Sequence, residues 1–178
     1  MTISNWAFRI QSALGYTWAA RSRYFLHSPF VYGFYENVLR EANPACLEVV
    51  LAPIDALRAS LLRDERPIQR LKTSTDGTLM PLDRQPVRRL AARESVPRNL
   101  GAFLYRFTQH YRPARILELG VNLGLSALYL QAGNPEANYI GIEGNPELAT
   151  LAQYHIHQMT FNGKVIESSF IDYLQNTE

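Results

Sequence analysis

The segment RILELGVNLG, residues 115–124, decides the fold of the second half of the chain. Its apolar run from Ile116 to Leu119 suits a strand that is buried on both faces. The run ends at Gly120, where the backbone must bend tightly, and helix-forming residues resume over 125–130. The order of strand, glycine-containing turn and helix predicts the first half of a βαβ unit, with a ligand-binding turn at the helix start.

The rest of this half keeps the same alternation of strands and helices. Asn145 can cap the helix after the second strand, because Pro146 suits the first helical turn and Glu147 complements the helix dipole. Right-handed crossovers would place the three strands in the order 3-2-1, which is half of an open parallel α/β sheet. The expected strands are residues 115–119, 139–143 and 165–167, and the expected helices are 97–110, 125–131 and 146–159.

The first part of the chain is patterned for helices. Ser28 can cap a helix that begins near Pro29, and a further helix should run to about residue 62, with Pro53 either kinking it or marking its first turn. Before them, four apolar residues recur at intervals of four, which predicts one face of an amphipathic helix. These residues are Trp6, Ile10, Leu14 and Trp18.

A change in charge supports a division into two parts. Residues 1–100 carry 14 Lys and Arg against 9 Asp and Glu, whereas residues 101–178 carry 4 against 7. Between 64 and 83 the periodicity fails and turn residues such as Asp76-Gly77 appear, so we interpret this stretch as a linker. The expected organisation is a helical extension over 1–96 followed by an α/β domain over 97–178.

Composition sets limits on location and partners. The chain is 47% hydrophobic and 19% charged, with no apolar run of membrane-spanning length, and its first residues do not resemble a secretory signal. The single Cys46 cannot form an internal disulfide, so a cytoplasmic location and no membrane partner are expected. Four arginines lie near one face of a short helix without interleaved aromatic residues, which favours a solvated face over a nucleic-acid site. They are Arg84, Arg88, Arg89 and Arg93.

The turn after the first strand does not match the dinucleotide fingerprint G-x-G-x-x-G, since its second and third glycines are missing. The spacing is E-x-G-x-x-x-G, from Glu118 through Gly120 to Gly124. ILELGVNLGLSALYL resembles the first motif of the class I S-adenosylmethionine-dependent methyltransferases. YIGIEGNPELATLA is similar to their second motif, with Glu143 twenty-three residues after Gly120.

This resemblance implies a Rossmann-like methyltransferase sheet that binds S-adenosylmethionine at the carboxyl ends of its strands. Glu143 would accept hydrogen bonds from the ribose hydroxyls, and Glu118 would orient the ammonium group directly or through water. The two glycines would leave room for the ligand, at least one of them with a positive φ. The implied cofactor residues are Glu118, Gly120, Asn122, Gly124, Glu143, Gly144, Ser168, Ser169 and Phe170.

The resemblance also implies a seven-stranded sheet, of which the chain would hold three strands, so we expect a truncated domain. Catalytic residues cannot be assigned, and no metal site is expected, because His155 and His157 lie two apart on a helix and cannot share a face. His27 is interpreted as a structural histidine. The first strand would have an unpaired edge, which predicts pairing with another copy, or coverage by the N-terminal segment.

The leading hypothesis is therefore methyl transfer to the oxygen or nitrogen of a small-molecule substrate, with a possible homodimer through the first strand or the N-terminal helices. A second hypothesis is a catalytically silent binding or assembly module that retains the half-fold. A third, a nicotinamide-dependent oxidoreductase, is disfavoured by the glycine spacing.

Overall fold

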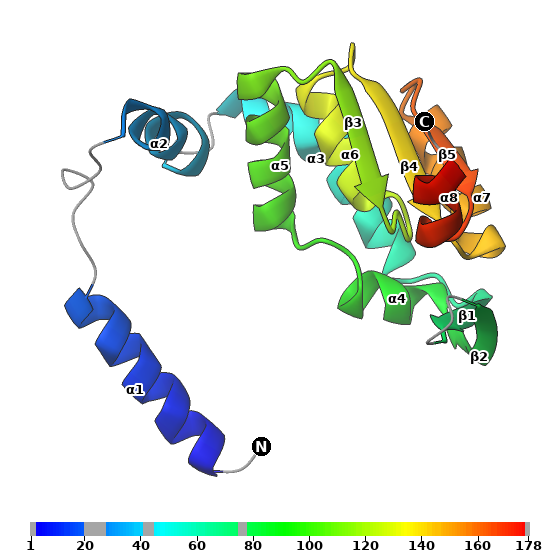
Figure 1. The fold of residues 1–178 in the computed structure, drawn as a ribbon, viewed down its shortest axis with the longest axis horizontal. Helices are drawn as coiled ribbons and strands as arrows, with labels where there is room; N and C mark the ends of the chain where they lie inside the picture. The colour runs from blue at the N-terminus through cyan, green and yellow to red at the C-terminus, as the bar shows by residue number, and fades with distance from the viewer. Residues whose placement is uncertain (1–2, 20–27, 41–44, 75–77, 177–178) are drawn as a thin grey trace. The chain divides into compact units, whose positions relative to one another are not determined.

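The computed structural model describes residues 3–19, 28–40, 45–74 and 78–176 of the 178-residue chain. Two compact units divide at Arg40 and Glu41 rather than near residue 97 (Figure 1). The predicted boundary therefore moves, because the elements between 45 and 93 belong to the same unit as the parallel sheet. His27 lies outside the described residues, as do the side chains of Trp6 and Cys46.

The first unit contains helices only within its described residues. These are α1 (Ile3–Ala19), α2 (Pro29–Phe34) and the π-helix η2 (Tyr35–Leu39). The predicted start at Pro29 is confirmed, since the Ser28 side chain accepts a hydrogen bond from the Val31 backbone amide at 3.4 Å. On α1 the apolar side chains of Ile10, Leu14 and Trp18 are exposed. The amphipathic pattern thus forms a helix whose apolar residues are not buried within this unit.

The predicted linker is wrong, because most of residues 64–83 belongs to an antiparallel hairpin. Its strands are β1 (Pro67–Thr73) and β2 (Leu79–Pro86), with Pro67 paired to Pro86 and a register shift between Gln69 and Leu71. The hairpin follows α3 (Ala45–Leu61), which carries Pro53 inside it, and leads into α4 (Val87–Arg93). The loop between the strands is where the Asp76-Gly77 turn was predicted, outside the described residues.

The α/β part follows the predicted alternation closely. Arg112 caps the C-terminus of α5 in a left-handed conformation with φ of 44°. Asn145 caps the N-terminus of α7, and its side chain accepts from the amides of Glu147 and Leu148. The elements are α5 (Arg98–Tyr111), β3 (Arg115–Leu119), α6 (Leu125–Gly133), β4 (Asn138–Glu143), α7 (Pro146–Gln158), β5 (Lys164–Glu167) and α8 (Phe170–Asn176).

The three later strands form one parallel sheet in the order β3-β4-β5, which confirms the predicted order 3-2-1. Leu117 pairs with Ile140 and Leu119 with Ile142, while Ile142 pairs with Ile166 on the other side. Paired residues of parallel strands point to the same face, so these apolar side chains share one face of the sheet. Tyr139 and Gly141 point to the opposite face.

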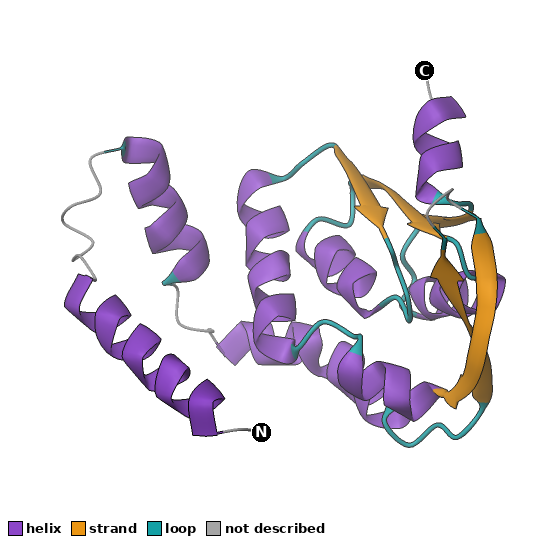
Figure 2. Ribbon diagram, turned by 60° about the horizontal axis from the view of Figure 1, so that its bottom comes forward, coloured by secondary structure: helices purple, strands orange, loops and turns teal. Residues whose placement is uncertain are grey.

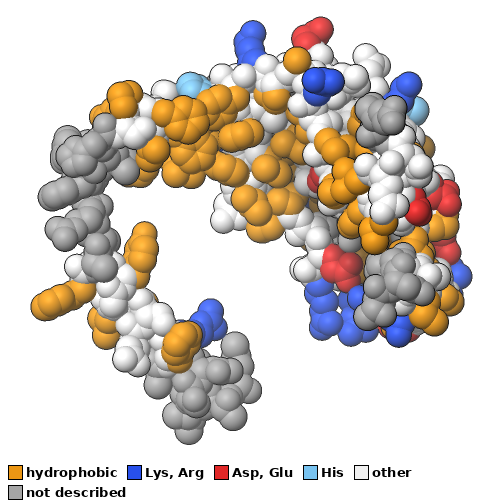
Figure 3. Space-filling model, in the orientation of Figure 1, with side chains coloured by type: hydrophobic (Ala, Val, Ile, Leu, Met, Phe, Trp, Pro, Cys, Tyr) orange, Lys and Arg blue, Asp and Glu red, His pale blue; other side chains and the backbone are white. Residues whose placement is uncertain are grey.

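The two faces of this sheet differ in burial. Helices α6 and α7 lie on the side of Tyr139 and Gly141, both of which are buried, and α8 lies on the other side (Figure 2). Leu117 remains 51% exposed and Leu119 44% exposed, so the expectation that β3 is buried on both faces is wrong. Hydrophobic side chains are visible on the surface of this unit in Figure 3.

The buried core lies between the helix-covered face of the sheet and the helices. Gly101 of α5 allows close packing, because an added Cβ would lie 2.2 Å from the ring of Tyr129 on α6. Arg98 ties α5 to α3 through an ion pair with Asp55 at 2.9 Å. None of the described helices is long and apolar enough to cross a membrane.

Candidate functional site

The turn between β3 and α6 has the backbone geometry that its glycines predict. Gly120 and Gly124 adopt φ values of 86° and 84°, and Asn122 between them adopts 51°. A side chain on Gly124 would also be crowded, since its Cβ would lie 3.2 Å from the Ala152 Cα. The expectation of at least one positive φ is confirmed at both glycines.

Glu143 ends β4 beside this turn and is held by two backbone amides. Its Oε2 accepts from the Asn122 amide at 2.8 Å, and its Oε1 accepts from the Asn145 amide at 3.0 Å. An ionised carboxylate can accept about four hydrogen bonds. Glu143 is therefore fixed in position and keeps acceptor capacity for a ligand.

Glu118 lies on the helix-covered face of the sheet. One carboxylate oxygen accepts from the Ser126 hydroxyl and the other accepts from the Tyr139 hydroxyl at 2.5 Å. Burial raises the pKa of Glu118 above its ordinary value, although the two hydrogen bonds oppose that shift. Burial and the neighbouring Glu118 also raise the pKa of Tyr139. This carboxyl thus has protein partners on both oxygens.

A cavity of about 340 Å³ opens beside the turn at the carboxyl ends of the strands. A smaller cavity of about 40 Å³ lies next to it, and Glu94 and Asn122 line both. Sites for small molecules occupy roughly 300–1,000 Å³, so the larger cavity has a suitable size. Its lining residues are Arg70, Leu71, Leu79, Leu90, Glu94, Asn122, Glu143, Gly144, Asn145, Leu148, Ser169, Phe170 and Ile171.

The structure brings most of the predicted cofactor residues to these cavities. Five line the larger cavity and Gly120 lines the smaller one. Gly124 and Ser168 lie in the adjoining turns without lining either cavity, and Glu118 lines neither. The five are Asn122, Glu143, Gly144, Ser169 and Phe170.

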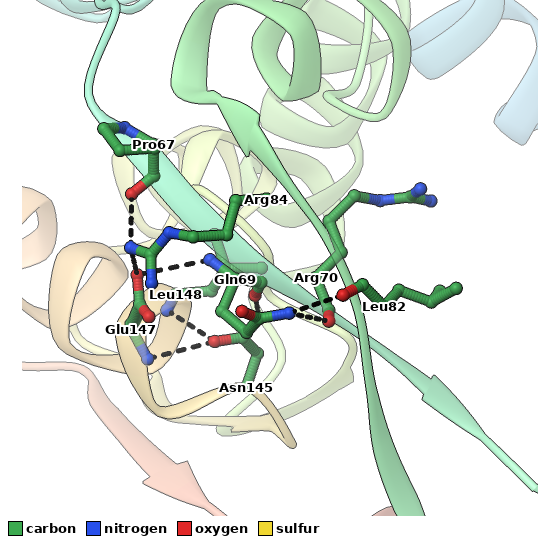
Figure 4. A network of polar contacts seen from close by, with 8 residues as sticks. All are labelled: Pro67, Gln69, Arg70, Leu82, Arg84, Asn145, Glu147 and Leu148. Atoms are coloured by element: carbon green, nitrogen blue, oxygen red, sulfur yellow. Dashed lines mark hydrogen bonds and ion pairs between the residues drawn. The ribbon is translucent and has the colours of Figure 1, made fainter.

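The hairpin supplies residues that the sequence interpretation missed. Its backbone is hydrogen-bonded to the start of α7, because Asn145 Nδ2 donates to the Gln69 carbonyl at 2.6 Å and the Gln69 amide donates to Glu147 at 3.3 Å (Figure 4). Arg84 adds contacts to Glu147 at 3.5 Å and to the Pro67 carbonyl at 2.9 Å. Leu71 and Leu79 of the hairpin line the larger cavity.

Three charged side chains line the larger cavity, namely the cation Arg70 and the carboxylates Glu94 and Glu143. Arg70 forms ion pairs with Asp83 at 3.4 Å and with Glu94 at 3.5 Å. Asn122 Nδ2 donates to Glu94 Oε2 at 3.3 Å, whereas the buried Asn122 Oδ1 has no hydrogen-bond partner. Because the Asn122 backbone amide also donates to Glu143, this residue joins the two carboxylates.

Histidines and metal ligands play no visible part in this site. His155 is buried, with Nδ1 2.8 Å from the Leu123 carbonyl, and burial lowers its pKa. His157 is exposed beside Gln153, which agrees with the predicted packing and exposure roles. Over the described ranges, no group of three or more His, Cys, Asp or Glu side chains could hold a metal ion.

The four arginines of the basic segment lie on the surface or form ion pairs there. Arg88 is exposed and pairs with Glu65 at 2.7 Å, and Arg84 pairs with Glu147. Arg89 and Arg93 are exposed on α4. Exposed pairs of this kind contribute little stability. None of these four arginines lines either of the two cavities described above.

No protein-family model and no curated protein sequence matches the chain. Among solved structures, it is similar to an O-methyltransferase from Bacillus cereus in complex with SAH (S-adenosylhomocysteine), at 22% identity and a TM-score of 0.45, covering 82% of this chain and 53% of that one. It is also similar to an SAH-bound methyltransferase from Podospora anserina, at 18% identity and a TM-score of 0.47, covering 79% and 57%. A methyltransferase from Geobacter sulfurreducens matches at 14% identity and a TM-score of 0.44, covering 82% and 60%. The chain thus spans between half and two thirds of the length of these proteins.

Proposed function

We propose that this chain is an S-adenosylmethionine-binding methyltransferase domain that acts on an oxygen or nitrogen nucleophile of a small molecule. The observation that carries this proposal is Glu143, which two backbone amides hold at the end of β4, on the wall of a cavity beside the turn at Gly120. Ligands of open α/β sheets bind at the carboxyl ends of the strands. A dinucleotide would instead require the glycine pattern that this turn lacks.

The residues present fit the chemistry of this cofactor. Glu143 would accept from the ribose hydroxyls, and Phe170 and Ser169 would border the adenine. The turn favours glycine at position 120, because its φ of 86° is one that residues with a side chain rarely adopt, and Phe170 Cζ lies 3.6 Å from where a Cβ would be. The buried Asn122 Oδ1 offers an acceptor that no protein group uses.

When bound, the cofactor would supply a methyl group activated by a sulfonium. The contribution of the chain would be to hold the cofactor in one orientation and to keep water away from it. Leu71, Leu79 and Ile171 are the apolar residues placed to exclude water from the larger cavity.

Isothermal titration calorimetry with S-adenosylmethionine and S-adenosylhomocysteine tests the proposal. Wild-type protein should bind both, and Glu143→Gln should bind them about 10- to 100-fold more weakly, since hydrogen bonds to a charged group are lost. Glu167→Gln is a matched control, because Glu167 pairs with Glu143 in the sheet register but does not line the cavity. Thermal unfolding of both variants separates loss of binding from loss of folding.

The other hypotheses predict different results. A silent binding module would bind the cofactor without transferring its methyl group to any member of a panel of phenols, catechols and amines. A thermal shift with NAD, but with neither S-adenosylmethionine nor S-adenosylhomocysteine, would support an oxidoreductase and reject the proposal. Absence of binding to all three would also reject it.

A further inference from the structure

The amino-acid end of S-adenosylmethionine carries an ammonium group and a carboxylate, so its site needs groups of both charges. Glu118 is the residue that the sequence motif suggests for the ammonium. In the structure, hydroxyl groups of Ser126 and Tyr139 occupy its two oxygens, and Glu118 lines neither cavity. Burial also raises its pKa, which disfavours the charged form that an ammonium requires.

Glu94 offers a carboxylate in a better position. It follows the last residue of α4 and lines both cavities, so it lies where the two cavities meet. Its side chain is 39% exposed, and its protein partners are Asn122 Nδ2 at 3.3 Å and Arg70 at 3.5 Å. Both distances are long for charge-assisted hydrogen bonds, so the carboxylate keeps capacity for a stronger partner.

Arg70 offers the matching positive charge. It comes from β1 of the hairpin and lines the larger cavity. Its ion pairs with Asp83 and Glu94 are 3.4 and 3.5 Å long, and a guanidinium has five N–H donors. Planar bidentate contact with a ligand carboxylate is the geometry that arginine favours.

Asn122 connects this pair to the ribose site. Its backbone amide donates to Glu143, and its side-chain amide donates to Glu94. Its Oδ1 is buried without a partner, which costs free energy unless a donor from a ligand or solvent reaches it. An ammonium group beside Glu94 would supply such a donor.

We propose that Glu94 and Arg70 bind the zwitterionic amino-acid end of the cofactor, with Glu94 and Asn122 Oδ1 accepting from the ammonium and Arg70 donating to the carboxylate. This assignment rests on the proposed function. In it, the hairpin and α4 complete the cofactor site, and the loose Arg70–Glu94 ion pair is exchanged for contacts with the two ligand charges.

Calorimetry with two nucleosides tests the assignment. S-adenosylhomocysteine carries the amino-acid end, whereas 5′-methylthioadenosine has the same adenosine and thioether but ends in a methyl group. Glu94→Gln and Arg70→Gln should each weaken S-adenosylhomocysteine binding about 10- to 100-fold and leave methylthioadenosine binding unchanged. Asp83→Asn is the control, because Asp83 pairs with Arg70 but does not line the cavity. It should change neither affinity by more than about twofold.

Two results would overturn the assignment while leaving the proposed function intact. One is an equal loss of affinity for both nucleosides in Glu94→Gln, or no loss for either, together with normal binding by wild-type protein. The other is a selective loss of S-adenosylhomocysteine binding in Glu118→Gln, which would return the ammonium to the motif residue. Failure of wild-type protein to bind either nucleoside would instead reject the proposed function and this assignment with it.

Discussion

The two faces of the β3-β4-β5 sheet are built differently. On one face, Tyr139 and Gly141 are buried beneath α6 and α7, and the only carboxyl that β3 contributes there, Glu118, has two hydroxyl partners. On the other face, Ile142 is fully buried, whereas Leu117 and Leu119 are about half exposed. Figure 2 shows α8 on one side of the strands and the longer helices on the other.

This difference in burial indicates which face of the sheet is covered by helices and which face leaves apolar side chains accessible. Parallel sheets are normally covered by helices on both faces, because their strands are apolar throughout. Within the described residues, β3 has one neighbouring strand, β4. The helix-covered face should therefore be intolerant of change, whereas the face of Leu117 and Leu119 should tolerate change and bind partners.

The largest effect is expected on the covered face, from Gly141→Ala. The added Cβ would lie 2.4 Å from Val121 Cγ2 and 2.7 Å from the Tyr139 hydroxyl, so it would displace both and disturb the hydrogen bond to Glu118. Overpacking of this kind costs about 3 kcal/mol of unfolding free energy. Urea denaturation at neutral pH measures the loss.

Gly144→Ala is the matched control for this prediction. It lies just beyond the same strand, and its Cβ would meet the end of the flexible Leu79 side chain at 3.0 Å. The variant should lose less than about 1 kcal/mol of unfolding free energy, because Leu79 can move. Equal losses in the two variants would show that the covered face is no more tightly packed than its rim.

A smaller effect on the same face should appear as a pH dependence of stability. Because burial raises the folded-state pKa of Glu118 above its ordinary 4.5, the folded chain keeps this proton to a higher pH than the unfolded chain does. The contribution of Glu118 to stability is then complete below pH 4.5 and is lost as the pH rises through the folded-state pKa. Glu118→Gln should lack this decrease.

Urea denaturation at a series of pH values would compare the two proteins. His155 acts in the opposite direction, since its lowered pKa makes stability rise as the pH rises toward and through 6.5. That effect is common to wild type and variant, so it cancels in their difference. If stability varied with pH in the same way for the two proteins, Glu118 would titrate no differently in the folded chain than in the unfolded chain.

Much of the fold could be predicted from the sequence, because the patterns that specify it are local. The alternation of apolar runs with helix starts such as Asn145-Pro146 predicted the three strands, their order and the helices between them. The exposure of Leu117 could not be predicted in the same way. Its apolar character indicates what a strand can bury, but burial depends on which elements are present to cover it.

The site could be predicted from the sequence only in part, for a related reason. The positive φ values of Gly120 and Gly124 follow from a local turn pattern, and Glu143 lines the larger cavity while Gly120 lines the smaller one. Their role in binding a ligand stays a prediction. The sequence predicts a linker where the structure has this hairpin, although an Asp-Gly pair such as Asp76-Gly77 is itself a hairpin signal. Its position against α7 depends on contacts between residues 69 and 145, which no local pattern encodes.

The smallest effect on stability is expected on the open face, from Leu119→Ser. A leucine that is 44% exposed contributes about 1 kcal/mol, roughly half of the value for full burial.

The larger effect of Leu119→Ser should be on association, because we expect the edge and open face of β3 to pair with a second copy of the chain. Sedimentation velocity over a range of concentrations should show self-association of wild-type protein and its loss in Leu119→Ser. Leu82→Ser, at 45% exposure on the hairpin, should associate as wild type does, so a monodisperse wild-type monomer or equal loss in both variants would contradict this role of the open face.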